Sequence, residues 1–561
     1  MMREKPDYGE NVTTEGTRAE SQDDPMHDDR LRVDALIDPP IEGQRKKKKP
    51  LAFYLSFLAI NIIVFVFSLD STTLAVAIPS IAEQLHGTTL QSFWASISFL
   101  LAVVITQPLY TSLSDIYGRK PLLQIAFLFF AIGSLVFALA QDMVGIIGGR
   151  VLQGLGGGGL DVLGEIIVAD MTTLKDRSIY LGIMAIPTAA GSILGPSIGA
   201  IFSQYASWRW IGWINLPYLG VAYPLVVFFL RLQRLEVSLL EKTKQLDWIG
   251  MALFSVGCLA FVLPLSWAGT LYPWSSWRTI VPLLLGALVL ATFVVYESKA
   301  IVPILPYRLF RSRTMTVTLA GAFVHGMMLF ALMQYLPFFY QAILRKTLIQ
   351  SALLLLPTSI ASVLAAGLSV TAVGFAGTYR WSVWLSWVLV TAGTGLLVLL
   401  SESSTTAIYY GLPIIWGVGI GALLRVLHLP LQASVPTVDD TGLAIGLLMF
   451  SRLLGGLVGL AISSTIFSSV FESSIAAMGS ALPESVAFLQ NANEAIGFIP
   501  RLRTVDLSPE VLSLIIHAYL TSFRAIFYTM TGFGALGFIV SLFIEDLDLQ
   551  KEELGRQQFQ S

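Results

Sequence analysis

Residues 51–81 read LAFYLSFLAINIIVFVFSLDSTTLAVAIPSI, an apolar stretch with a single charged side chain, Asp70. A membrane-spanning helix needs ~20 mostly apolar residues, so this stretch is long enough to cross a bilayer. A carboxylate at that depth costs roughly 2.5 to 3.5 kcal/mol on insertion scales, and it is rare unless it faces protein or water. The stretch therefore predicts a membrane span whose carboxylate has a function.

A second apolar stretch, residues 143–171, carries Arg150 near its start. If the two stretches are antiparallel spans, Asp70 and Arg150 lie at similar depth near the same face of the membrane. A carboxylate beside an arginine can gain or lose a proton when a conformational change separates the two groups. The pair therefore predicts a proton relay in a transporter, and the alternative is a static ion pair that holds the helices together.

Two further carboxylates, Asp161 and Glu165, lie one helical turn apart in the same stretch. They are ~16 Å along the helix from Arg150, and the glycine run at 156–159 before them permits close packing. They predict a second proton station or an acceptor for a cationic substrate. For Glu165 the alternative is a simple position at the cytosolic membrane interface.

The whole chain has the composition of a polytopic membrane protein. Of its 561 residues 55% are hydrophobic and 13% charged, and its mean hydropathy is +0.71. The single cysteine, Cys258, excludes an intrachain disulfide. Residues 1–50 are polar, end in the basic run RKKKK and lack the apolar core of a cleavable signal, so we expect a disordered cytosolic tail.

Fourteen segments are apolar and long enough to span a membrane. They are centred near Ile62, Leu101, Phe130, Leu155, Ala190, Gly220, Gly257, Leu288, Met327, Val363, Val390, Gly417, Gly455 and Gly534. Lysines and arginines of the short loops are concentrated on one side, which predicts that both termini are cytosolic. We expect an all-α polytopic membrane protein in which two six-helix bundles flank two extra central spans.

The predicted parts follow from these spans and from the polarity between them. They are the N-terminal tail at 1–50, the first bundle at 51–231, a linker with the two extra spans at 232–313, the second bundle at 314–545 with an outer loop at 472–522, and a cytosolic tail at 546–561. We also expect an amphipathic helix within the outer loop, at 509–520.

The loop after the second span reads TSLSDIYGRKP at residues 111–121. Gly118 permits a tight turn between two helices. Asp115 is placed to pair with Arg119 or Lys120, or to cap a neighbouring helix. Taken alone, the loop is also compatible with an ordinary turn whose basic residues mark the cytosolic face.

The fifth span contains GSILGPSIG at residues 191–199. Gly191, Gly195 and Gly199 are spaced four residues apart, which lets the backbone of a neighbouring helix approach closely. Pro196 removes one backbone hydrogen bond from the helix. Any tightly packed membrane helix can show such glycines, whereas their combination with a proline is more specific.

In chain order, these motifs resemble the signatures of the major facilitator superfamily. The loop at 111–121 resembles the signature between the second and third spans, and GRVLQGLG at 149–156 resembles the fourth-span motif. GSILGPSIG looks like the fifth-span motif of drug–proton antiporters. LDSTTLAVAIP at 69–79 and WRWIGWINLP at 208–217 are similar to signatures of the fourteen-span drug:H+ antiporter branch.

The resemblance covers residues 51–545 and implies a fungal-type multidrug or toxin efflux pump. It implies that Asp70 and Arg150 take part in proton coupling and that the 111–121 loop latches the cytosolic side. A degenerate second copy of that loop, GFAGTYR at 374–380, fits the internal repeat of paired bundles. The chain departs from the family pattern at Thr111, Ile116 and Ala200.

Polar side chains also interrupt several of the apolar segments, most of them in the second half of the chain. The candidate substrate cavity comprises Gln107, His325, Gln334, Phe338, Arg425 and His428. The rings and amides near Gln334 suit a bulky, mostly apolar ligand with a few hydrogen-bonding groups, or alternatively an aromatic belt at the membrane interface. The histidines lack metal-ligand spacing, so no metal site and no cofactor are predicted.

These observations predict a proton-coupled exporter of small organic molecules such as drugs, toxins or secondary metabolites. The alternatives are an importer of a siderophore or other nutrient, and a non-transporting sensor. The sequence has neither a Walker loop nor paired histidine boxes, so an enzyme is not expected. The expected partners are the substrate, protons and the lipid bilayer, without nucleic acid. We expect a monomer in the plasma membrane, with the vacuolar membrane as the alternative.

Overall fold

The computed structural model describes residues 49–87, 89–233, 246–268, 272–300, 303–478, 482–491, 494–549 and 557–560. It separates Met1–Lys49 from a compact unit, Pro50–Ser561, and only the second is described below. The predicted N-terminal tail therefore lies almost entirely outside the described residues. Within them, regular structure is helical apart from two isolated β-bridges.

Fourteen candidate membrane spans are found in the described residues, and each predicted span centre falls inside one of them. The helices that form them are α2 (Leu51–Gln84), α3 (Thr89–Tyr117), α4 (Arg119–Leu139), α5 (Met143–Met171), α6 (Leu174–Tyr205), α7 (Trp210–Trp213) with α8 (Asn215–Phe229), α10 (Trp248–Trp267), α11 (Trp277–Glu297), α12 (Arg313–Ala342), α13 (Leu348–Ala376), α14 (Arg380–Leu396), α15 (Thr406–Val426) with α16 (His428–Ala433), α17 (Thr441–Ala476) and α19 (Pro509–Ser541). The predicted all-α membrane fold is confirmed.

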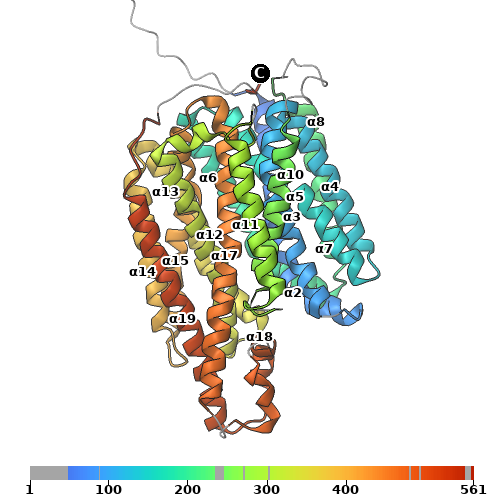
Figure 1. The fold of residues 1–561 in the computed structure, drawn as a ribbon, viewed down its shortest axis with the longest axis vertical. Coiled ribbons are helices and arrows are strands. Elements are labelled where there is room, and N and C mark those ends of the chain that lie inside the picture. The colour runs from blue at the N-terminus through green and yellow to red at the C-terminus, as the bar shows by residue number, and fades with distance from the viewer. Residues whose placement is uncertain are drawn as a thin grey trace, which may run out of the picture. The chain divides into compact units, whose positions relative to one another are not determined.

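The helices pack in two groups with two helices beside them. In the first group α2 packs on α6 and α5 packs on both α3 and α4; in the second α12 packs on α17 and α15 packs on both α13 and α14. Helices α10 and α11 pack on each other, and α10 also touches α3 and α17 (Figure 1). This pairing agrees with the expected two bundles and two extra spans, although the residue boundaries stay predictions.

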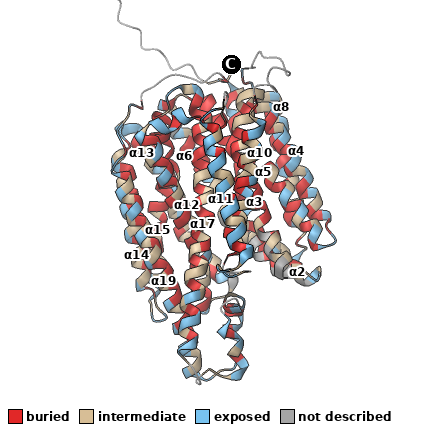
Figure 2. Ribbon diagram, in the orientation of Figure 1, coloured by how far each residue is buried: buried red, intermediate tan, exposed pale blue. Residues whose placement is uncertain are grey.

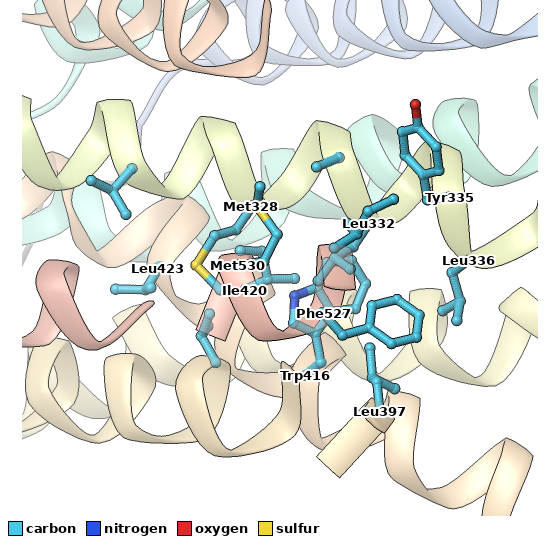
Figure 3. Close-up of a cluster of buried hydrophobic side chains, with 14 of the residues drawn as sticks. Met328, Leu332, Tyr335, Leu336, Leu397, Trp416, Ile420, Leu423, Phe527 and Met530 are labelled. Atoms are coloured by element: carbon cyan, nitrogen blue, oxygen red, sulfur yellow. The ribbon is translucent and has the colours of Figure 1, made fainter. Parts of the chain in front are cut away.

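Most of the buried apolar residues of each group belong to one large cluster, and only a few residues of the other group join it. Figure 2 shows buried residues on the inward faces of the helices and exposed residues on their outer faces, the pattern of a helix bundle surrounded by lipid. In the second group, Met328 and Leu332 of α12 meet Trp416 of α15 and Phe527 and Met530 of α19 (Figure 3).

The region between α17 and α19 differs from the expectation. Residues 509–520, expected as an amphipathic helix of the outer loop, form the first turns of the continuous helix α19. Ser508 caps this helix by accepting a hydrogen bond from the Val511 amide at 3.4 Å, and Pro509 occupies the first helical turn. The described residues of the connection contain only the short helices η5 (Glu484–Gln490), α18 (Ala495–Phe498) and η7 (Ile499–Arg503).

Candidate functional site

Asp70 lies at the centre of a buried polar network inside the first group of helices. Its Oδ2 accepts a hydrogen bond from Arg150 Nη1 at 2.6 Å, and its Oδ1 accepts from Asn215 Nδ2 at 2.8 Å and Gln153 Nε2 at 3.2 Å. Ser134 Oγ joins the network as a partner of both amides at 3.1 Å. The Asp70 carboxylate thus has a charged partner and two neutral donors.

Four helices supply this network: α2, α4, α5 and the first residue of α8. Asp70 is 1% exposed, and the Arg150 guanidinium stacks 4.3 Å from the centre of the Phe99 ring. In the structure Asp70 and Arg150 form the ion pair that matched depth predicts. Sequence reasoning did not assign Gln153, Asn215 or Ser134 to the site, although the first two lie inside motifs that were noted.

The glycines of the 191–199 motif pack α6 against the part of α2 that carries Asp70. A Cβ at Gly191 would lie 2.5 Å from the Phe65 carbonyl oxygen. A Cβ at Gly195 would collide with the Thr72 side chain, and one at Gly199 with a backbone oxygen of α2. Real Cβ atoms do not approach so closely, so only glycine allows this helix pair. Pro196 lies within the continuous helix α6.

A second polar cluster joins the two groups of helices. Glu165 of α5 forms an ion pair with Arg425 of α15, and Arg425 Nη2 also donates to Thr188 Oγ1 of α6 at 3.0 Å. One turn earlier on α5, Asp161 Oδ2 accepts from Gln107 Nε2 at 2.8 Å. Glu165 is 5% exposed and is held between the two groups of helices by its pair with Arg425.

Three more residues of the second group border this cluster. His428 is fully buried, and neither of its ring nitrogens has a hydrogen-bond partner within the described residues. His325 Nε2 contacts the Ile420 carbonyl oxygen at 2.9 Å, and Arg452 Nη2 donates to the Leu424 carbonyl at 3.0 Å. The carboxylates of the cluster therefore come from the first group, and its arginines and histidines come from the second.

Several buried polar atoms of the cluster remain unsatisfied by the described protein atoms. They are Gln107 Oε1, Glu165 Oε2, Arg425 Nε, Arg452 Nε and the two ring nitrogens of His428. Buried polar groups are normally hydrogen-bonded, and leaving one unpaired costs about 1–3 kcal/mol. This set includes both donors and acceptors, which suits a ligand with polar groups of both kinds.

Two residues predicted for the cavity are not brought into this cluster. Gln334 and Phe338 lie about 13.5 Å or more along α12 from His325. Gln334 is exposed, and the Phe338 ring packs at right angles to Tyr335, with 6.1 Å between the ring centres. These contacts are compatible with a surface for a bulky apolar ligand and with an aromatic belt at the membrane interface.

The loop between α3 and α4 forms a tight, internally paired turn. Gly118 has a φ of 101°, a conformation that favours glycine. Arg119 pairs with Asp115 and, at 3.1 Å, with Asp170 of α5. Lys120 Nζ donates to carbonyl oxygens at the end of α8, at 2.8 and 2.9 Å. The basic residues of this loop are thus used to hold the first group of helices together.

The two groups also touch at this end of the molecule. We call it the basic end, defined by Arg119, Arg177 and Arg308, the last of which pairs with Asp440 at the start of α17 at 2.7 Å. Arg177 Nη1 of α6 donates to Gln432 Oε1 of α16 at 2.7 Å. A Cβ at Gly446 of α17 would lie 2.8 Å from Thr111 Cγ2 of α3. The family departure at Thr111 is therefore accommodated by a glycine on the facing helix, and the basic end is closed.

The described histidines, cysteine and carboxylates do not gather in groups of three or more that could hold a metal ion. The histidines of the central cluster instead contact backbone or lie unpartnered. The site is therefore built from ion pairs and amides.

Comparison with known proteins places these features in a family. Residues 60–460 match the family model described as Major Facilitator Superfamily. The chain is 52% identical to the MFS-type transporter sphD of Aspergillus fumigatus, over 92% of this chain and 90% of that protein. It is 33% identical to the efflux pump FUS6 of Gibberella moniliformis, over 92% of this chain and 91% of that protein.

A solved structure shows the same fold. The human organic anion transporter MFSD10 aligns with a TM-score of 0.57 over 88% of this chain and all of its own, at 14% identity. At that identity the likeness concerns the fold alone. The fourteen candidate spans and the relatives together make this chain a multi-pass membrane protein.

Proposed function

The chain belongs to the major facilitator superfamily, and on that premise we propose that it exports small organic molecules in exchange for protons. Transport of small molecules follows from the family, whose members are not enzymes. The direction and the coupling to protons are the proposed parts. Several similar proteins bear the name efflux pump, including FUS6 and the MMF1 pump of Mycosarcoma maydis, which favours export over import.

The observation that carries the proposal is the Glu165–Arg425 ion pair between the two groups of helices. Breaking a buried pair leaves an uncompensated charge and costs about 3–5 kcal/mol. Protonation of Glu165 removes its charge and weakens the pair, so the groups can separate around the cluster. A proton that reaches Glu165 from outside the cell thus favours the transition that exposes the cluster to the cytosol.

The substrate is proposed to bind where the unsatisfied polar atoms gather. Gln107 Oε1 and Glu165 Oε2 can accept hydrogen bonds, while Arg425 Nε and Arg452 Nε can donate them. Satisfying such atoms is worth more in a buried site than in water, because an unpaired buried group is costly. A substrate with a few polar groups on a mostly apolar body would fit, as expected for pockets of this kind.

The Asp70–Arg150 pair is proposed as the second proton-coupling element. It lies within the first group and is fully paired in this conformation. Movement of α2 relative to α5 would lengthen the contact with Arg150 and allow the carboxylate to take up a proton. The Asp115–Arg119 loop would act as the latch of the basic end, which the positive-inside rule places in the cytosol.

Accumulation assays test direction and coupling together. Cells that express the protein are loaded with a panel of fluorescent organic compounds, with and without a protonophore. We expect lower accumulation of some compounds than in control cells, and loss of the difference when the protonophore is added. Higher accumulation in expressing cells would indicate an importer, and equal accumulation throughout would favour a non-transporting sensor. We further propose a monomer in the plasma membrane, which fractionation and size-exclusion measurements test.

A further inference from the structure

The last described residues, 557–560, lie against the first group of helices at the basic end. An antiparallel β-bridge joins Phe559 to Leu232, just after α8. Backbone hydrogen bonds flank the bridge: the Gln233 amide donates to the Gln558 carbonyl at 3.0 Å, and the Gln560 amide donates to the Arg231 carbonyl at 2.8 Å. This pairing fixes the backbone of the segment next to the start of α4.

Gln557 reaches from this segment into the turn between α3 and α4. Its side chain is 6% exposed. Its Oε1 accepts a hydrogen bond from the Arg119 amide at 2.9 Å, and its Nε2 donates to the Ser114 carbonyl at 3.1 Å. One side-chain amide thus connects the end of α3 with the beginning of α4.

The contact supplies what the local sequence lacks. The first amides of a helix have no partner within the helix and are usually satisfied by the side chain of the capping residue. The capping residue of α4 is Gly118, which has no side chain to offer. Gln557, distant in sequence, therefore acts as the cap for the Arg119 amide.

The capped residue also lies against the second group of helices. The Arg119 guanidinium pairs with Asp115 and Asp170, and its Nη2 would lie 2.5 Å from a Cβ at Gly442, near the start of α17. A shift of the Arg119 backbone would move this guanidinium against α17. Gln557 consequently fixes one side of the contact that closes the basic end.

The chain just before this segment is held by the second group. The Glu545 amide donates to Thr314 Oγ1 at 3.1 Å, and the Leu547 amide donates to the Tyr379 hydroxyl oxygen at 2.9 Å. Tyr379 in turn donates to the Glu545 carbonyl at 2.6 Å. The C-terminal chain is therefore anchored on both groups of helices, on either side of residues 550–556.

We propose that residues 557–560 are part of the gate at the basic end, with Gln557 as a positioning residue for Arg119. The docked segment stabilises the state in which this end is closed. Its loss shifts the transporter toward the state in which the end is open. The role is independent of the substrate and of proton coupling, because it depends only on contacts within the chain.

Cysteine labelling measures the opening directly. Cys258 is the only cysteine and is buried, so Cys258→Ala provides a background without thiols. Thr111→Cys then places a reporter at a buried site opposite Gly446 of the other group. Inside-out membrane vesicles are treated with a membrane-impermeant maleimide, and the labelling rate reports how often the basic end opens.

The variants separate the side chain of Gln557 from the rest of the segment. Gln557→Met keeps the length but removes both hydrogen bonds, and the loss of two such bonds corresponds to about tenfold in an equilibrium. We expect labelling to accelerate about tenfold in Gln557→Met and at least as much when residues 557–561 are deleted. Gln558→Met is the matched control and should label like the full chain.

Two results would overturn the proposal. Unchanged labelling after the deletion would show that the segment has no part in closing the basic end. Equal acceleration in Gln557→Met and Gln558→Met would show that the Gln557 amide does not position Arg119. Size-exclusion profiles and thermal stability in detergent identify a misfolded variant, and Gln557→Glu, which keeps the acceptor for Arg119, should label more slowly than Gln557→Met.

Discussion

Replacing Asp70 by asparagine tests whether its network moves protons or only holds helices together. The substitution keeps the shape and removes the charge. The carboxylate accepts from three donors, Arg150, Gln153 and Asn215. An asparagine at this position has a single acceptor oxygen, and its amide faces at least one of these donors without an acceptor.

The expected magnitude follows from burial. Asp70 and Arg150 are each 1% exposed, so the variant leaves the arginine charge buried and uncompensated. Such a change costs about 3–5 kcal/mol, roughly a hundredfold or more in the stability of the paired arrangement. A lost transport activity in Asp70→Asn alone therefore fits both a proton relay and a structural ion pair.

The double variant Asp70→Asn/Arg150→Gln separates the two. Removing both charges restores most of the stability that the single change costs, because no buried charge remains unpaired. The assay is accumulation of an exported compound in whole cells, with membrane expression measured in parallel. We expect both variants to reach the membrane without proton-driven transport. Full activity of the single or the double variant would refute a proton-coupling role for Asp70.

Two further predictions concern the contacts between the groups of helices. Gly446→Ala places a methyl group against Thr111 and should hold the basic end open, which reduces transport. Gly532→Ala is the control, because no atom lies within 4 Å of a Cβ added there, and this variant should transport normally. Equal transport by both variants would contradict a close contact between Gly446 and Thr111. Arg425→Gln leaves Glu165 buried without its charged partner and should lower thermal stability in detergent at neutral pH by several degrees, with recovery in Arg425→Gln/Glu165→Gln. A double variant as unstable as the single one would show that the unpaired charge of Glu165 does not cause the loss of thermal stability.

The hydropathy of the sequence predicts the membrane spans, and the depth of charged residues within the spans predicts the Asp70–Arg150 pair. Each candidate span has at least 20 residues, about the length that a bilayer requires, so apolar length alone identifies it. Asp70 and Arg150 are expensive at membrane depth, and that cost makes their pairing predictable. The start of α19 was missed because residues 509–520 are more polar than a typical span, while the structure continues them into the last helix.

The sequence does not show which side chains from distant helices contact each other in the fold. Glu165 and Arg425 are 260 residues apart, and nothing in either helix specifies that they meet. Neutral members of the Asp70 network, such as Ser134 and Asn215, carry no charge, so the cost of burying a charge, which singles out Asp70 and Arg150, does not identify them. The docking of Gln557 depends on a turn whose own capping residue is a glycine, and that need becomes visible only with the helix ends in place.

Helix α5 links the two polar sites mechanically. It carries Arg150 at one end of its length and Asp161 and Glu165 toward the other. Between them, a Cβ at Gly154 would lie 2.5 Å from a backbone oxygen of α3, and one at Gly159 would lie 2.7 Å from a side chain of α4. A helix packed this closely on both sides cannot bend or slide on its own, because interiors at such density transmit displacement. We infer that the Asp70–Arg150 pair separates when α2 moves against a fixed α5, and that the Glu165–Arg425 pair separates when α15 does. Proton binding at one pair and opening at the other are then both motions relative to α5.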